Sequence, residues 1–258
     1  MKKTLILLFT IVSLQLFSQG LTFSTATPQQ LSDKIVNPKC VTTSNWVVSS
    51  GSNFGSLNSV GTFNRPNGVN FPLGKGIVLS TGHLTNLPGP KILPDYIGDG
   101  NNPSWSSDND MNAIVGSSNF TNASSLQFEF TSQKTDFKLD YVFASEEYGQ
   151  RQCNTLSDVV VILLTDMSTG LPVNIASTPS NQLISPINIR RNTFNTSCSD
   201  ANANLFDTFY GGTNASTSPI NMFGHTVAMT AQATIQTGHL YKLKIIIADR
   251  LDYQFDSA

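Results

Sequence analysis

The side chains with the clearest capacity for chemistry are carboxylates, which occur in tight groups. The chain has only 17 acidic residues in 258, and most of the grouped ones fall at the ends of expected strands. The groups are Asp108 with Asp110, Glu146 with Glu147, Asp158 alone, and Asp249, Asp252 and Asp256. Strand ends gather at the two rims of a β-sandwich, so these groups are expected to converge there. Clustered oxygen ligands suit Ca²⁺, and a cation also relieves repulsion between neighbouring carboxylates.

Other interpretations of these residues stay open. Acids at strand ends are often simply solvated loop residues. A glycosidase would use Glu146 or Glu147 as acid or base, but neighbours on a strand point to opposite faces, so the two cannot flank one bond together. Asp252 would then be a candidate partner. Exposed aromatic residues could instead stack on sugars. Four aromatic residues lie in or near expected turns: Trp46, Tyr96, Trp105 and Tyr148.

Several enzyme and nucleic-acid signatures are absent from the sequence. There is no G-x-S-x-G and no H-E-x-x-H, and Gly74-Lys75-Gly76 lacks the spacing of a phosphate loop. The formal net charge is −2, so there is no basic field to hold a phosphate backbone. We therefore expect a protein that does not bind nucleic acid and has no catalytic activity.

The amino terminus has the pattern of an export signal. Residues 1–19 combine Lys2 and Lys3 with an apolar run and a small polar end, which predicts a secretory signal peptide. The run is shorter than the ~20 apolar residues that a membrane span needs, and no later stretch could span a bilayer. The mature chain is therefore expected to be secreted, with residues 20–258 forming one domain.

Export permits disulfide bonds between the three cysteines, Cys40, Cys153 and Cys198. Cys153 and Cys198 both lie in loop sequence rich in Asn, Ser and Thr, so a bond between them is our first choice. The alternative is that all three are free and buried.

The order of expected elements indicates an all-β protein. Thr27 as N-cap, Pro28 and Gln30 predict one short N-terminal helix that ends near Asn37. Apolar residues then alternate with polar ones, or run continuously, in several segments that predict strands. These segments are 76–80, 126–130, 139–143, 159–164, 227–235 and 241–247. Dense strands without intervening helices predict an antiparallel β-sandwich, resembling a jelly roll.

Four segments in this order resemble a known family. They are Gly76-Ile-Val-Leu-Ser-Thr-Gly82, Tyr141-Val-Phe-Ala-Ser-Glu-Glu-Tyr148, Asn174-Ile-Ala176, and the run from Leu240 to Asp249 that continues to Asp256-Ser257. Over about Leu31 to Ala258, the chain is similar to the choice-of-anchor L domain of bacterial surface proteins. The resemblance implies an exported module with an adhesive or structural role at the cell surface. Members carry varied sorting signals, which in gliding Bacteroidetes-type bacteria are type IX secretion signals.

The resemblance also bears on the sites. The family pattern continues into an apolar strand beyond Asp256-Ser257, whereas this chain stops at Ala258, which suggests a truncated domain. The acids of the motifs coincide with the candidate calcium ligands: Glu146, Glu147, Asp158, Asp249, Asp252 and Asp256. No catalytic activity is established for the family, so the expected partner is a surface ligand, either a glycan or a protein.

Overall fold

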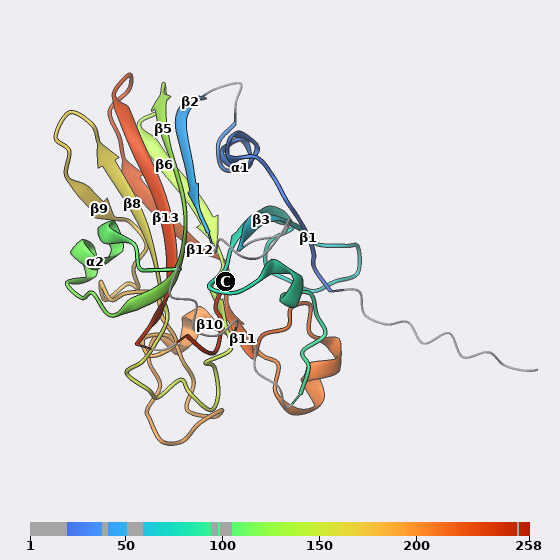
Figure 1. The fold of residues 1–258 in the computed structure, drawn as a ribbon. Helices are drawn as coiled ribbons and strands as arrows, with labels where there is room; N and C mark the ends of the chain where they lie inside the picture. Colours follow the sequence, from blue (N-terminus) through green and yellow to red (C-terminus); the bar gives the residue numbers. More distant parts are fainter. Residues whose placement is uncertain (1–19, 38–40, 51–58, 94–97, 99–104, 252) are drawn as a thin grey trace, which may run out of the picture.

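The structure is a computed structural model that describes residues 20–258 except 38–40, 51–58, 94–97, 99–104 and 252 (Figure 1). Its largest sheet has five antiparallel strands in the order β2-β5-β13-β8-β9. The strands are β2 (Val41–Ser49), β5 (Phe120–Ser132), β13 (Leu240–Arg250), β8 (Val159–Asp166) and β9 (Pro172–Asn174). The predicted all-β, antiparallel class is confirmed.

The described residues also form three smaller antiparallel sheets. The first pairs β12 (Met229–Thr234) with β6 (Asp136–Tyr141). The second orders β1 (Thr22–Ser24), β3 (Val60–Asn64) and β4 (Lys75–Leu79). The third orders β10 (Phe206–Phe209), β11 (Gly224–Thr226) and β7 (Ala144–Ser145). Short 3₁₀ turns lie at Leu84–Asn86, Ala203–Leu205 and Gly212–Thr217.

Strand β8 shows why the large sheet lies in the middle of the protein. Side chains alternate between the two faces of a strand. Val160, Ile162 and Leu164 join the main core, which also contains residues of β6 and β12. Their neighbours Val159, Val161 and Leu163 join a second core, on the opposite face, with Met111 of α2 (Asn109–Val115). The continuous apolar run of β8 is therefore buried on both faces, as the sequence predicts.

Two α-helices are present among the described residues, whereas the sequence predicted one. The expected N-terminal helix is α1 (Pro28–Ile35), and its capping box between Thr27 and Gln30 is formed. The additional helix, α2, begins after Asp108, whose side chain accepts hydrogen bonds from the first turn, and ends at Gly116 in the left-handed conformation. It covers the outer face of the large sheet (Figure 1). No helix within the described residues is long and apolar enough to cross a bilayer.

Candidate functional site

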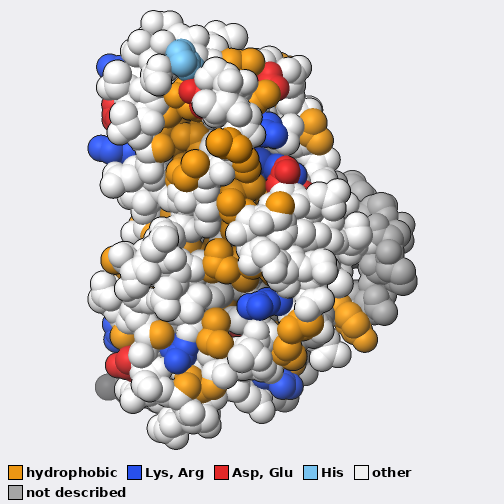
Figure 2. All heavy atoms as spheres, turned by 90° about the vertical axis from the view of Figure 1, so that its left-hand side faces the viewer, with side chains coloured by type: hydrophobic (Ala, Val, Ile, Leu, Met, Phe, Trp, Pro, Cys, Tyr) orange, Lys and Arg blue, Asp and Glu red, His pale blue; other side chains and the backbone are white. Residues whose placement is uncertain are grey.

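The acids of the family motifs lie near one another inside the protein. Asp252 lies outside the described residues. The other five are buried, and we call them the acidic junction: Glu146, Glu147, Asp158, Asp249 and Asp256. On the face seen in Figure 2, charged side chains lie scattered among uncharged ones and form no single field.

Hydrogen bonds and strand register connect these acids. The backbone N–H of Asp158 donates to Oε2 of Glu147 over 2.9 Å, and that of Glu146 donates to the carbonyl oxygen of Asp256 over 3.0 Å. Asp249 follows Ala248, which pairs with Val159, so Asp249 and Asp158 lie at neighbouring ends of β13 and β8. The convergence expected from the sequence therefore occurs at the end of the large sheet, in a buried place.

A buried lysine accompanies the acidic junction. Lys91 Nζ lies 3.0 Å from Oε1 of Glu146, with neither side chain exposed, and it also lies 4.5 Å from the centre of the Phe223 ring. Sequence reasoning did not single out Lys91, because one lysine in a long polar segment carries no signal of burial. Among the described residues, no three or more His, Cys, Asp or Glu side chains form a group that could hold a metal ion. The calcium site stays a prediction.

Asp108 and Asp110 have a different role from the one expected. Asp108 caps α2, and Lys244 of β13 binds both acids, with Nζ 2.8 Å from Oδ2 of Asp108 and 2.7 Å from Oδ2 of Asp110. This pair therefore fastens α2 to the sheet, which corrects its assignment to a shared cluster of ligands.

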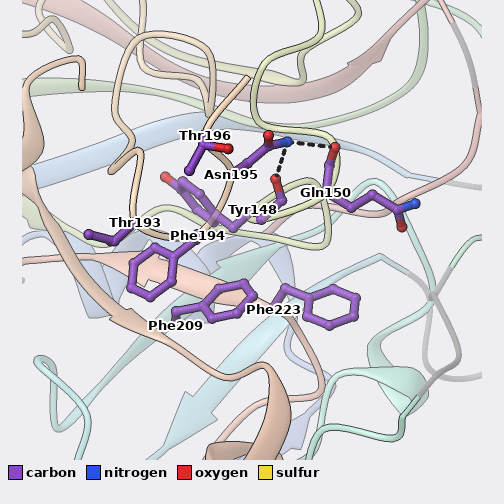
Figure 3. A pocket seen from close by; sticks show the side chains of 9 residues that line it. Tyr148, Gln150, Thr193, Phe194, Asn195, Thr196, Phe209 and Phe223 are labelled. Carbon is purple, nitrogen blue, oxygen red and sulfur yellow. Dashed lines mark hydrogen bonds between the residues drawn. The ribbon is translucent and has the colours of Figure 1, made fainter. Parts of the chain in front are cut away.

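The four aromatic residues that could stack on sugars differ in their surroundings. Trp105 is buried and donates from Nε1 to the carbonyl oxygen of Ala123. Trp46 is half-buried on β2 and donates to Thr43. Tyr96 lies outside the described residues. Tyr148 lines a pocket that has a volume of about 540 Å³ (Figure 3).

This aromatic pocket is built on a stack of phenylalanines. The rings of Phe194 and Phe209 are 4.5 Å apart and nearly parallel, and Phe209 in turn stacks on Phe223 at 6.0 Å. Uncharged polar residues, Gln150, Asn195 and the threonines at 193 and 196, complete the lining (Figure 3). No charged side chain is among the described residues that line the pocket.

Glycines and a disulfide hold the pocket in place. Gly149 has a φ of +81°, and a Cβ there would lie 2.7 Å from the Phe209 ring, while one at Gly211 would lie 2.2 Å from it. Asn195 donates from Nδ2 to the carbonyl oxygens of Gly149 and Gln150 (Figure 3). A disulfide joins Cys153 to Cys198, the pairing that the sequence favoured, and so ties these two loops together.

The Tyr148 hydroxyl is the polar group of the pocket that stands out. It is buried and has no hydrogen-bond partner among the described residues. Burial raises the pKa of this phenol above its ordinary value, and the nearby charge of Glu147 raises it further. Tyr148 therefore stays neutral, with a hydroxyl hydrogen to donate.

Comparison with known proteins supplies the family. The model of the Choice-of-anchor L domain matches residues 19–258, nearly the whole chain. The chain belongs to this family. A search of curated proteins and a search of solved structures gave no match. Membership implies a surface-exposed module.

In this choice-of-anchor L domain, three of the motif segments meet around the last residues. Ala144 and Ala258 exchange backbone hydrogen bonds of 2.8 and 2.9 Å. Ser257 donates its N–H to Oγ1 of Thr81 and its hydroxyl to Oδ2 of Asp158. The motifs are therefore a structural junction, and they place Tyr148, the last residue of the second segment, at the aromatic pocket.

Proposed function

We propose that this choice-of-anchor L domain is a non-catalytic adhesive or structural module that contacts its partner through the aromatic pocket. The observation that carries the proposal is the buried Tyr148 hydroxyl, which has no hydrogen-bond partner among the described residues and lies in the same pocket as the exposed Phe194. Buried polar groups normally find a hydrogen-bond partner, and a ligand in the pocket would supply one. Apolar rings with a few directed polar groups are typical of binding sites.

The acids of the second motif support binding rather than hydrolysis. A glycosidase needs two carboxyl groups that flank a bond in an open cleft. Glu146 is instead buried against Lys91, and Glu147 accepts hydrogen bonds from Ser157 and Asp158 inside the protein. Both glutamates are thus engaged in holding the junction together.

A glycan is the second, more specific candidate. Sugars present apolar C–H faces together with hydroxyl groups, and they stack on aromatic rings. The pocket offers the Phe194 ring beside the hydroxyl and amide groups of Thr196 and Asn195, and none of its described lining residues carries a charge to select an ionic ligand. A protein loop with an exposed aromatic or amide side chain is the alternative partner.

Arrays of glycans and of surface proteins test both candidates. We expect the wild-type protein to retain a ligand and Phe194→Ala to lose it. Tyr253→Ala is the matched control, because Tyr253 is about as exposed as Phe194 (39% against 37%) and does not line the pocket. Equal retention by Phe194→Ala and wild type would remove the pocket from the proposal. Shorter products in the mass spectrum of a retained glycan would overturn the non-catalytic role.

We further propose that the acidic junction binds calcium and that the protein is exported. The burial of five carboxylates that lie near the end of the large sheet supports a cation, since buried carboxylates without a counter-charge are costly. The signal-like residues 1–19 lie outside the described part of the chain and support secretion, in line with the type IX route expected from the resemblance. Amino-terminal sequencing of the exported protein tests the cleavage, which we expect after residue 19.

A further inference from the structure

A second cavity, apart from the aromatic pocket, lies under the large sheet. Its volume is about 400 Å³, which is within the ~300–1,000 Å³ typical of small-molecule sites. Its wall includes Ile162 of β8 and Ile245 of β13, and strands β4 and β6 line it with Ile77 and Leu139. None of its lining residues belongs to the aromatic pocket.

Apolar side chains dominate this wall, so water gains little by entering. Ile77 and Leu139 pack against the main core but are only half-buried. An apolar cavity that stays accessible is a site where an apolar ligand replaces water at little cost. The wall therefore predicts a ligand with a hydrocarbon part.

The charged residues on the cavity lining indicate that the ligand also has an anionic group. Three lysines line it, Lys34 of α1, Lys75 of β4 and Lys138 of β6, and all three are exposed. They therefore mark the place where the cavity meets solvent. Asp140 is the one acid on the lining among the described residues, and it accepts a hydrogen bond of 2.6 Å from Thr230.

The excess of positive charge on the cavity lining does not follow from the composition of the whole chain. The cavity has three lysines against one aspartate, whereas the chain as a whole carries a formal net charge of −2. No ion pair within the described residues involves any of the three lysines. An anion at the cavity mouth would be attracted by all three.

We propose that this cavity binds a single-chain amphiphile with an anionic head, of the fatty-carboxylate class. The hydrocarbon chain lies along the isoleucine and leucine wall, and the carboxylate lies among Lys34, Lys75 and Lys138. The inference does not depend on the aromatic pocket, so Phe194→Ala is expected to leave this binding unchanged.

Titration calorimetry with saturated fatty carboxylates below their micelle concentrations tests whether the hydrocarbon chain of the ligand is buried in the cavity. Each added methylene that is buried should tighten binding about fourfold, so dodecanoate should bind about fifteenfold more tightly than decanoate. Dodecyltrimethylammonium, which has the same chain and a cationic head, should bind at least about tenfold more weakly than dodecanoate, and raised salt should narrow that difference.

Variants test the site itself. Replacing Lys34, Lys75 and Lys138 together by Gln should weaken dodecanoate binding, whereas Lys134→Gln, an exposed lysine that does not line the cavity, should not. Ile77→Trp should fill the cavity and prevent binding, with Val173→Trp on the exposed edge strand β9 as the control. Thermal melts identify any variant that fails to fold. In that case the comparison of carboxylates of different length and of the two head groups, made on the wild-type protein, still tests the proposal.

Three results would overturn the proposal. The first is a lack of saturable binding by any of the carboxylates. The second is equal affinity for the cationic and anionic amphiphiles. The third is binding only to vesicles of phosphatidylglycerol, which would indicate a membrane surface as the partner.

Discussion

Lys91 Nζ lies 3.0 Å from Oε1 of Glu146, and neither side chain is exposed. Lys91 comes from a long polar segment, whereas Glu146 belongs to the motif that the family resemblance identified. A buried ion pair is costly to form, because both charges lose their hydration. It is still more costly to break, because the remaining charge is then buried alone. The pair thus fixes Lys91 beside the acidic junction.

Lys91→Met should therefore destabilise the domain strongly. Removing one partner of a buried ion pair typically costs about 3–5 kcal/mol. Urea unfolding followed by circular dichroism would measure the loss. Lys134→Met, at an exposed lysine, should change the free energy of unfolding by less than about 0.5 kcal/mol.

The double variant Lys91→Met with Glu146→Gln distinguishes charge from packing. It should recover part of the stability lost by Lys91→Met, since no carboxylate is then left opposite an apolar side chain. A double variant with the summed loss of the two single ones would show that the two residues do not interact energetically.

The disulfide between Cys153 and Cys198 should stabilise the domain, because it closes a loop and so lowers the entropy of the unfolded chain. The two cysteines are 45 residues apart, and the loop-closure relation gives about 4 kcal/mol for such a loop. Unfolding of the oxidised and reduced protein in a Cys40→Ser background would measure the difference, because only one pairing is then possible. The same background with Cys198→Ser should show no effect of reductant.

The fold could be predicted where a local pattern decided the structure. The alternation of Leu126, Phe128 and Phe130 predicted β5, and the capping box at Thr27 predicted α1. Helix α2 was missed, although its cap residues Asp108 and Gly116 are visible in the sequence. Its seven residues are too few to show a clear apolar stripe.

The candidate site was only partly predictable, for a different reason. The motif acids could be found because acids are rare in this chain, and Tyr148 could be found by its place at a turn. Phe194 and Phe209 were not found, because their stacking depends on a tertiary contact between a loop residue and the end of β10. Nor did any sequence pattern show that the acids would be buried beside Lys91.

The link between α2 and the sheet should weaken in acid. The hydrogen bond from Lys244 lowers the pKa of Asp110 below its ordinary value of 3.8, against the effect of burial. A carboxyl group with a lowered pKa in the folded state gives stability that is present above its unfolded pKa and lost as the pH falls through the folded one.

Deprotonation of Lys244 should weaken the link between α2 and the sheet at alkaline pH. Burial lowers its pKa, but the hydrogen bonds with Asp108 and Asp110 outweigh burial and raise the pKa above 10.5. The contribution of Lys244 to the stability of the fold is thus fully present below pH 10.5 and is lost as the pH rises through its raised pKa. Urea unfolding of wild type and Lys244→Met should show a larger difference at pH 7 than at pH 3. A constant difference would contradict the ion pairs.

Calcium should raise the melting temperature if the acidic junction binds it. A ligand that binds only the folded state stabilises it by about 2.7 kcal/mol at a hundredfold excess over its Kd. Thermal melts in calcium and in chelator measure the shift. Asp158→Asn should abolish it, whereas Asp136→Asn, at an exposed acid on β6, should retain it. Identical melting temperatures in calcium and chelator would reject a structural ion.

Gly149→Ala should damage the aromatic pocket beyond the cost of its backbone conformation. The residue has a φ of +81°, and the added Cβ would lie 2.7 Å from the Phe209 ring. Gly170→Ala is the matched control, because Gly170 has a φ of +71° with no atom within 4 Å of the added Cβ. Backbone strain alone costs about 1 kcal/mol in this region, so the control should lose about that much.

Gly149→Ala should lose more than the control, because Phe209 must shift and break its stack with Phe194. The near-ultraviolet circular dichroism of the aromatic residues should change in Gly149→Ala and not in Gly170→Ala. Any ligand retained on the arrays should then be lost together with the stack, since the pocket depends on the position of that ring. Equal stability and equal spectra for the two variants would show that Phe209 is free to move aside.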